Sequence, residues 1–357
     1  MSPRAKSIVV FLVKALIAAT LIGWLIRSGV LKFGALKIFF ERPILLVADL
    51  GLFSFAVLTG TLRWRALLVL AGARIPFWRG VQLQMTAMFF NVVVPGNVGG
   101  DVVKALYVAR DSEPEKRTAI LLIVFVERLV GMAALVLVAS FVAVLRGPTL
   151  WQNEQTRQLA MAVAFLGFCT VVGPAAFVIV MRRSGERLER WASGPSRLAK
   201  LAARLIAAAR LLSSGPKQLA IALSLSMLTH TGTMLFFSVL TRAITDQDVP
   251  FSSIATVFPL GILTMIVPIA PAGLGVGHAA FGGLFELIGV HGGATIFNVY
   301  LIGQLAPCLL GVFPYLALKR SGKLPTEKEA EAANTATPAP PPAPAPVPAP
   351  AKPLDEP

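Results

Sequence analysis

Charged and flexible residues interrupt the apolar sequence in the stretch VPGNVGGDVVK, residues 94–104. Asp101 and Lys104 follow Gly99 and Gly100 at a spacing that places both side chains on one face of a helix. A helix N-terminus offers unpaired N–H groups and partial positive charge, which suit an anion such as a lipid phosphate. The stretch therefore predicts a head-group site, where Lys104 offsets a phosphate or Asp101 pairs with a cation. A mutual ion pair that closes the turn is the alternative.

A second charged pair, Glu127-Arg128, lies inside the apolar run FVERLVGMAAL. Ionisable residues inside membrane segments are costly and are usually functional. Because adjacent helix residues point in different directions, each needs its own partner. We expect Glu127 to face Lys104 or Arg128 to face Asp101. The glycines match neither nucleotide-binding fingerprint and no metal-ligand spacing occurs, so we expect no cofactor and no metal.

A similar break occurs later in the chain, where Pro271-Ala272-Gly273-Leu274-Gly275 repeats the pattern P-x-x-[V/L]-G of Pro95-Gly96-Asn97-Val98-Gly99. Broken apolar segments at matching positions of two halves point to a transport site near the bilayer midplane. Simple kinks in two packed helices are the alternative. We expect re-entrant turns at Pro95, Gly96 and Pro271. The predicted substrate-binding residues are Asn97, Gly99, Gly100, Asp101, Lys104, Glu127, Arg128, Gly273, Gly275 and His278.

Long apolar runs must position these residues, because 55% of the chain is hydrophobic. A bilayer core of ~30 Å needs ~18 or more apolar residues per helix. We therefore predict an all-α polytopic membrane protein. It has about six to eight transmembrane helices plus two Pro/Gly-broken re-entrant hairpins in an inverted-repeat arrangement. The apolar runs are residues 8–26, 44–62, 119–145, 159–181, 218–240 and 295–318.

Basic residues between the runs fix the predicted topology through the positive-inside rule. Both termini and the basic loop 182–217 are placed in the cytoplasm, and that loop has the pattern of an amphipathic helix on the membrane surface. The basic loop 27–42 would then lie outside, which the rule does not explain. The first arm, residues 81–94, is too short to cross, so the first hairpin enters from the cytoplasm and the second from outside.

The rest of the composition limits the partners. The net charge of +15 is concentrated in loops, where membrane topology explains it, so we expect membrane lipids rather than nucleic acid as the ligand. The Arg63-Trp64-Arg65 sequence is typical of an interfacial anchor. The transmembrane domain is predicted to cover residues 1–322, with inverted halves of about 1–145 and 158–322, and the Pro/Ala-rich segment 323–357 is predicted to be disordered.

In chain order, the segments RWRALL, NVVVPGNVGGDVVKALYV, ERLVGMAALVL and PIAPAGLGVGHAAF resemble the lysylphosphatidylglycerol synthase transmembrane family, also called flippase-like domain proteins. The similarity spans about residues 8–320. It implies a bacterial membrane domain that moves a polar-headed lipid between leaflets. The family often has an acidic residue where this chain has Gly277-His278, and a Glu/Arg pair where it has Asp101 and Lys104. Lysylphosphatidylglycerol is therefore not assumed to be the substrate. We also expect no synthase domain, because only the Pro/Ala-rich segment follows.

The function expected from these residues is translocation of a phospholipid or glycolipid across a bacterial inner membrane, without enzymatic chemistry. The head group is expected to be anionic, aminoacylated or glycosylated. A membrane-embedded transferase acting on a lipid carrier is one alternative, with Glu127, Asp101 and His278 as acid–base groups. A solute transporter, or an accessory subunit that docks an envelope-biosynthesis protein through its tail, is the other.

Overall fold

The computed structural model describes residues 37–93, 99–145, 157–173, 196–265 and 275–320, together with Gly34, Glu154 and Ala176. Every regular element in this part of the chain is a helix, which confirms the all-α prediction. The helices are α2 (Lys37–Glu41), α3 (Pro43–Leu70), α4 (Phe77–Val93), α5 (Gly99–Arg110), α6 (Pro114–Leu145), Arg157–Gly173, α9 (Arg197–Ser213), α10 (Pro216–Thr245), α11 (Phe251–Thr264), α12 (Val276–Leu287), α13 (Gly293–Leu309) and α14 (Val312–Arg320).

Four of the described helical segments are long and apolar enough to cross a membrane: α3, α6, α10 and the segment Gly293–Leu318, which joins α13 to α14. They coincide with four of the predicted apolar runs, so the polytopic prediction is confirmed. Proline begins α3, α6 and α10, where its missing N–H costs no helical hydrogen bond. The predicted run 8–26 lies outside the described residues. Helix Arg157–Gly173 covers only the first part of run 159–181, and most of the remainder also lies outside.

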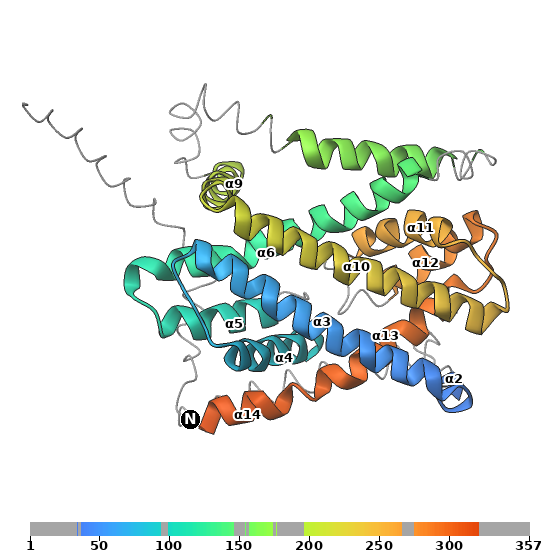
Figure 1. The fold of residues 1–357 in the computed structure, drawn as a ribbon, viewed down its shortest axis with the longest axis horizontal. Helices are drawn as coiled ribbons and strands as arrows, with labels where there is room; N and C mark the ends of the chain where they lie inside the picture. Colours follow the sequence, from blue (N-terminus) through green and yellow to red (C-terminus); the bar gives the residue numbers. More distant parts are fainter. Residues whose placement is uncertain are drawn as a thin grey trace, which may run out of the picture.

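Helices α3 and α10 lie side by side and run antiparallel (Figure 1). Phe55 is close to Gly232, the Thr229 hydroxyl donates to the Thr59 hydroxyl at 2.8 Å, and Arg63 donates to the Ser226 hydroxyl at 3.3 Å. Contacts at higher residue numbers on α3 thus fall at lower residue numbers on α10, as expected of antiparallel helices. This pair forms the centre of the molecule, and both broken segments pack beside it.

The two predicted breaks are present as two helical hairpins. The first hairpin consists of α4 and α5, which pack against each other, and the second consists of α11 and α12. Their helices have 17, 12, 14 and 12 residues, whereas ~20 are needed to span ~30 Å. The hairpins lie toward opposite ends of the α3–α10 pair, as an inverted arrangement requires (Figure 1).

Two details of the hairpins differ from prediction or lie beyond the description. Helix α4 begins at Phe77 rather than at residue 81, because Trp78 and Arg79 add a first turn. Arg79 is held there by Asp111, at 3.5 Å. The turns themselves, residues 94–98 and 266–274, lie outside the described residues. The predicted positions Pro95, Gly96, Asn97, Pro271 and Gly273 lie in those turns.

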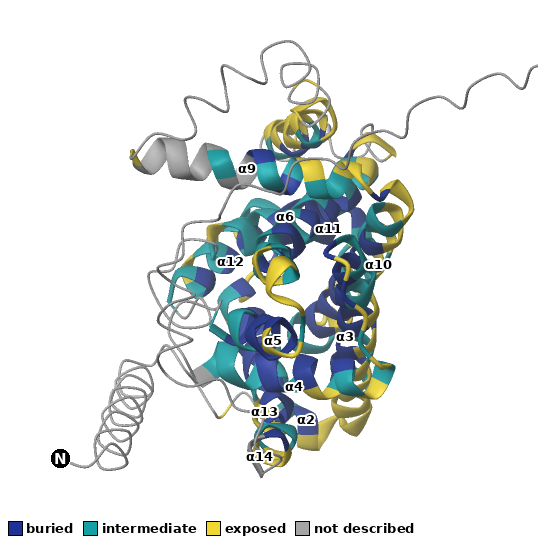
Figure 2. Ribbon diagram, turned by 90° about the vertical axis from the view of Figure 1, so that its left-hand side faces the viewer, coloured by how far each residue is buried: buried dark blue, intermediate teal, exposed yellow. Residues whose placement is uncertain are grey.

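The buried residues form two main clusters, one around each hairpin. The first contains Trp64, Tyr107 and Ile120, and the second contains Phe237, Phe281 and other aromatic residues. Buried residues lie on the inward faces of α3, α5, α6 and α10, whereas many outward residues are exposed (Figure 2). Large apolar side chains are among the exposed residues, as expected of a surface covered by lipid. They include Phe40, Phe141, Phe165, Phe168 and Phe313.

Basic residues gather at the end of the molecule where the first hairpin opens. Helix α9 packs at the basic end against α6 and α10, with Ile206 and Ala208 buried. The amphipathic segment predicted in the loop 182–217 is therefore helical over Arg197–Ser213, and its buried face contacts protein. The basic residues are Arg74, Arg79, Arg110, Lys116 and Arg117.

Candidate functional site

The N-terminus of α5 is held tightly against α4. A β-carbon at Gly100 would overlap the carbonyl oxygen of Ala87, so only glycine permits this approach. The Gly100 N–H donates to the Asn91 side-chain oxygen at 2.9 Å, which satisfies one of the unpaired donors at the helix start. The backbone packing of the first hairpin thus fixes the direction in which the first turn of α5 presents Asp101 and Lys104.

Lys104 is fully buried and contacts both carboxylates of the site. Its ammonium nitrogen lies 2.8 Å from Glu127 Oε2 and 3.3 Å from Asp101 Oδ1. Lys104 also donates to Gln84 Oε1 at 3.1 Å and lies 5.0 Å from the centre of the Trp64 ring. These partners together compensate a lysine with no access to water, since an isolated buried ammonium would be very costly.

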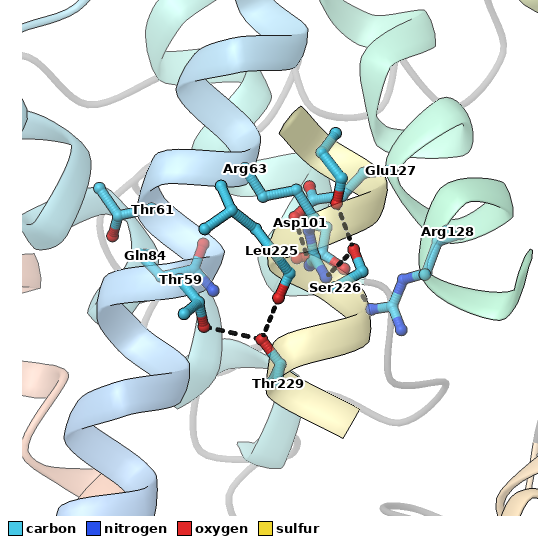
Figure 3. A network of polar contacts seen from close by, with 12 residues as sticks. Thr59, Thr61, Arg63, Gln84, Asp101, Glu127, Arg128, Leu225, Ser226 and Thr229 are labelled. Carbon is cyan, nitrogen blue, oxygen red and sulfur yellow. Dashed lines mark hydrogen bonds and ion pairs between the residues drawn. The ribbon is translucent and has the colours of Figure 1, made fainter. Parts of the chain in front are cut away.

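Two arginines complete a charge network that consists of Arg63, Asp101, Lys104, Glu127 and Arg128. Arg63 donates to Glu127 Oε1 at 2.8 Å, and Arg128 forms an ion pair with Asp101 Oδ2 (Figure 3). The predicted pairings of Glu127 with Lys104 and of Arg128 with Asp101 are both present. The mutual Asp101–Lys104 pair is present as well, so the two interpretations coexist. The five residues come from α3, α5 and α6, three elements that meet only in the folded chain.

The charge network has a buried side and an accessible side. The side chains of Lys104 and Glu127 are 0% and 5% exposed, whereas that of Arg128 is 40% exposed. With three cations and two carboxylates, the charge network carries an excess of one positive charge. An arginine guanidinium binds phosphate or carboxylate through parallel hydrogen bonds. The arrangement can therefore receive an anionic group on its Arg128 side.

The structure corrects the prediction for Arg63-Trp64-Arg65. Trp64 is 0% exposed and packs beneath Lys104, so it does not lie at the membrane–water interface. Arg63 points into the charge network, and only Arg65, which donates to the Ile75 carbonyl, lies near the end of α3. Alternating basic and aromatic residues are typical of both settings. Sequence alone therefore did not separate an anchor from a buried ion pair.

Neutral polar residues line the contact between α3 and α10 next to the charge network. Ser226 and Thr229 of α10 meet Arg63 and Thr59 of α3 (Figure 3). His230 forms a hydrogen bond of 3.0 Å with the Gly131 carbonyl of α6. Sequence reasoning missed the roles of Gln84, Asn91 and Ser226. Neutral residues of this kind commonly bond within their own helix and give no distinct pattern.

Among the described residues of the second hairpin, the only acidic or basic side chain besides His278 is Glu286, which is exposed. His278 Nε2 lies 3.2 Å from the Asn298 side-chain oxygen of α13, and His278 Nδ1 accepts from the Gly275 N–H at 3.4 Å. The His278 ring meets Phe297 edge to face. Gly275 and His278, both predicted to bind substrate, thus lie at the start of α12. His278 contacts Phe297 of the second buried cluster and lies apart from the charge network.

The sequence profile of the family described as Lysylphosphatidylglycerol synthase TM region matches residues 11–311. The chain belongs to this family. Comparisons with curated proteins and with solved structures gave no match. The matched range contains both hairpins and the whole charge network. Membership in the lysylphosphatidylglycerol synthase TM-region family identifies a membrane protein related to lipid handling.

Proposed function

We propose that this protein is a lipid translocase, without enzymatic activity, that moves a polar-headed phospholipid or glycolipid between the leaflets of a bacterial inner membrane. The observation that carries the proposal is the charge network beside a hairpin too short to cross. Non-helical backbone and charged side chains at membrane depth are tolerated where protein or a wet cavity surrounds them. A lipid head group needs such a polar surface to cross the apolar core.

The excess positive charge favours an anionic head group. A phosphate that approaches Arg128 competes with the Asp101 carboxylate for the same guanidinium. Asp101 then keeps its contact with Lys104, at 3.3 Å, so no carboxylate is left without a cation. The head group thus exchanges one ion pair for another instead of requiring a new buried charge, and the acyl chains remain in the lipid around the exposed apolar side chains.

The charge distribution supports an orientation for the proposed translocase. Basic residues at the open end of the first hairpin favour a cytoplasmic location for that end. Helix α14 ends on the same side, where Leu318 packs in the first buried cluster, which is consistent with a cytoplasmic C-terminus. In this orientation the accessible part of the charge network is approached from the inner leaflet, where anionic lipids are abundant.

A translocation assay in proteoliposomes tests the proposal. Fluorescent anionic, zwitterionic and aminoacylated lipids are reconstituted with the protein, and a membrane-impermeant quencher reports the fraction in the outer leaflet. We expect the wild-type protein to accelerate movement of the anionic lipid most strongly. Arg128→Gln, Asp101→Asn and Glu127→Gln should each slow it tenfold or more. Arg242→Gln is the matched control, since its side chain is 75% exposed at the opposite end.

Other outcomes separate the alternatives. Equal leaflet distributions with and without protein, for every lipid tested, would reject translocation. A lipid that changes mass rather than leaflet would favour the transferase alternative. Movement that survives all three charge-network variants would preserve the function but place its site elsewhere. The accessory-subunit alternative predicts that truncation after Gly322 abolishes function in cells, whereas a translocase retains it in proteoliposomes.

A further inference from the structure

Asp49 is a buried acid that the charge network does not use. It lies in the second turn of α3, ~9 Å from the start of the helix, and is 1% exposed. The Gln304 side-chain amide of α13 donates to Asp49 Oδ1 at 2.9 Å. Asp49 Oδ2 has no hydrogen-bond partner in the described part of the protein. A charged carboxylate with one free oxygen would be very costly in this position.

No described basic residue compensates Asp49. Arg42, the nearest basic residue before it on the chain, pairs with Asp246 at 3.8 Å, and Lys37 of α2 pairs with Glu41. The titratable side chains that face Asp49 are the neutral groups Tyr300 and Cys308 of α13. The other helices packed against α3 carry further charged or titratable groups, but these are paired with other residues or lie toward other parts of the helices. They are Arg79 of α4, Glu115, Lys116, Arg117, Glu127 and Arg128 of α6, and Lys217, His230 and Arg242 of α10.

Close packing of α13 shields the Asp49 carboxyl. A β-carbon at Gly303 would lie 2.8 Å from Asp49 Oδ2 and 2.9 Å from Oδ1, too close for any other residue without displacement. The amide N–H of Gln304, rather than its oxygen, is directed at Asp49. A metal cation requires several oxygen ligands, so this surrounding suits a proton far better than a metal ion.

We propose that Asp49 binds and releases a proton during the transport cycle and thereby couples lipid movement to a proton gradient. The inference rests on the proposed translocase function. The compact contact between α3 and α13 seen here accommodates the neutral acid, with the proton on Oδ2. Loss of the proton leaves an unpaired carboxylate, which favours a second arrangement in which water reaches Asp49. A ligand shifts a conformational equilibrium when it binds one state more tightly than the other. Here the proton is the ligand, and it binds Asp49 more tightly in the compact state than in the state that water reaches.

The same helix connects this acid to the charge network. Asp49 and Arg63 lie on α3 about 21 Å apart along its axis. Asp49 contacts α13 of the second half, whereas Arg63 contacts Glu127 of the first. Movement of α3 relative to α13 on deprotonation would therefore also displace Arg63.

A chemical test of the proton site does not depend on transport. Dicyclohexylcarbodiimide, an apolar carbodiimide, reacts with protonated carboxyls in apolar surroundings. We expect it to label Asp49 in membranes, with less label as the pH rises, and to spare Asp101 and Glu127, whose carboxylates are paired with cations. Mass spectrometry of the peptides gives the readout. An unlabelled Asp49 from mildly acidic to mildly alkaline pH would overturn the proposal.

The coupling itself is tested in proteoliposomes with the fluorescent anionic lipid and an imposed pH gradient. We expect the gradient to shift the final leaflet distribution at least twofold in the wild-type protein, and Asp49→Asn to abolish this shift while still equilibrating the lipid. Asparagine matches the shape of the neutral acid, so this variant should fold. Gly303→Ala should weaken the shift, and Gly51→Ala, which has open space around it, is the matched control.

The outcomes distinguish this inference from the proposed function. Wild-type movement that is insensitive to the gradient overturns proton coupling but leaves the translocase intact. A gradient response that persists in Asp49→Asn also overturns the assignment. No lipid movement by the wild-type protein contradicts the proposed function, and the coupling with it.

Discussion

The two hairpins are both built from helices too short to cross the membrane, but their surroundings differ in chemistry. The first is surrounded by the five residues of the charge network, whereas the second is surrounded by five phenylalanines. Phe281 stacks on Phe237 and Phe297 at ring separations of 5.3 and 4.8 Å, and Phe258 and Phe285 complete the aromatic group. The two hairpins therefore do not offer two equivalent sites. The described residues of the first hairpin supply a buried ion-pair surface, whereas those of the second supply an aromatic apolar core.

The largest expected difference between the hairpins concerns their carboxylates. Glu127→Gln removes the anion that faces both Lys104 and Arg63, which leaves buried cations without full compensation. Breaking a buried ion pair of this kind costs about 3–5 kcal/mol of stability. Thermal unfolding in detergent should show a clearly lower midpoint. Glu286→Gln in the second hairpin, where the residue is exposed, should leave the midpoint unchanged; an equal loss would contradict the contrast.

A comparable loss is expected at the centre of the aromatic group, but with a different functional result. Phe281→Ala removes a fully buried ring and should cost about 3–5 kcal/mol. Because no charge is altered, the ratio of anionic to zwitterionic lipid movement should stay at the wild-type value. Unfolding midpoints and the two transport rates measured on one preparation check this. A changed ratio would show that the second hairpin also contributes to head-group selectivity.

Glycine substitutions should have opposite signs in the two hairpins. Gly100→Ala forces α5 away from the Ala87 carbonyl and should destabilise the protein by about 1–3 kcal/mol. Gly283→Ala in α12 meets nothing within 4 Å and should stabilise its helix by about 0.5–1 kcal/mol. Chemical denaturation of the two variants in parallel measures both signs. Equal effects would mean that the tight α4–α5 approach is not retained in the membrane.

The smallest effect is expected at His278. Its hydrogen bonds to Asn298 and Gly275 are neutral and measure 3.2 and 3.4 Å. His278→Ala should therefore cost about 0.5–1.5 kcal/mol, with little change in transport. Unfolding and proteoliposome assays provide the comparison, and Asn298→Ala should give a similar value. A transport loss as large as that of Arg128→Gln would place His278 in the substrate path.

Four residues of the charge network were predictable from the sequence, because a charged side chain inside an apolar membrane segment needs a partner. Asp101, Lys104, Glu127 and Arg128 lie inside apolar runs, so each needed a partner, and few partners were available. Arg63 was missed because its tryptophan neighbour resembles an interfacial belt, although Trp64 proved to be buried. Asp49 was overlooked within the run 44–62, even though an acid inside an apolar run is a recognisable signal.

The fold was predictable to the level of its helices but not of their contacts. Run lengths indicated the spans α3, α6 and α10, and the Pro-Gly motifs marked the hairpins. The first turn of α4 was missed because Trp78 and Arg79 are typical of a membrane surface. Which faces of α3 and α10 meet depends on small residues such as Gly232 and on hydroxyl pairs such as Thr59 and Thr229. Such residues have no periodicity strong enough to predict a partner.

The unbroken α3 helix has a mechanical consequence. Its 28 residues form a stiff rod with Asp49 near one end and Arg63 toward the other, and the Thr59–Thr229 hydroxyl contact ties it to α10 between them. A rod that tilts about such a fulcrum moves its two ends in opposite directions. Under the proposed proton coupling, displacement of the Asp49 end relative to α13 would therefore be accompanied by displacement of Arg63 relative to Glu127. Opposite movement of the two ends of α3 would keep the surroundings of Asp49 and the charge network from becoming accessible to water at the same time. Ions would then not leak across the membrane as a lipid passes.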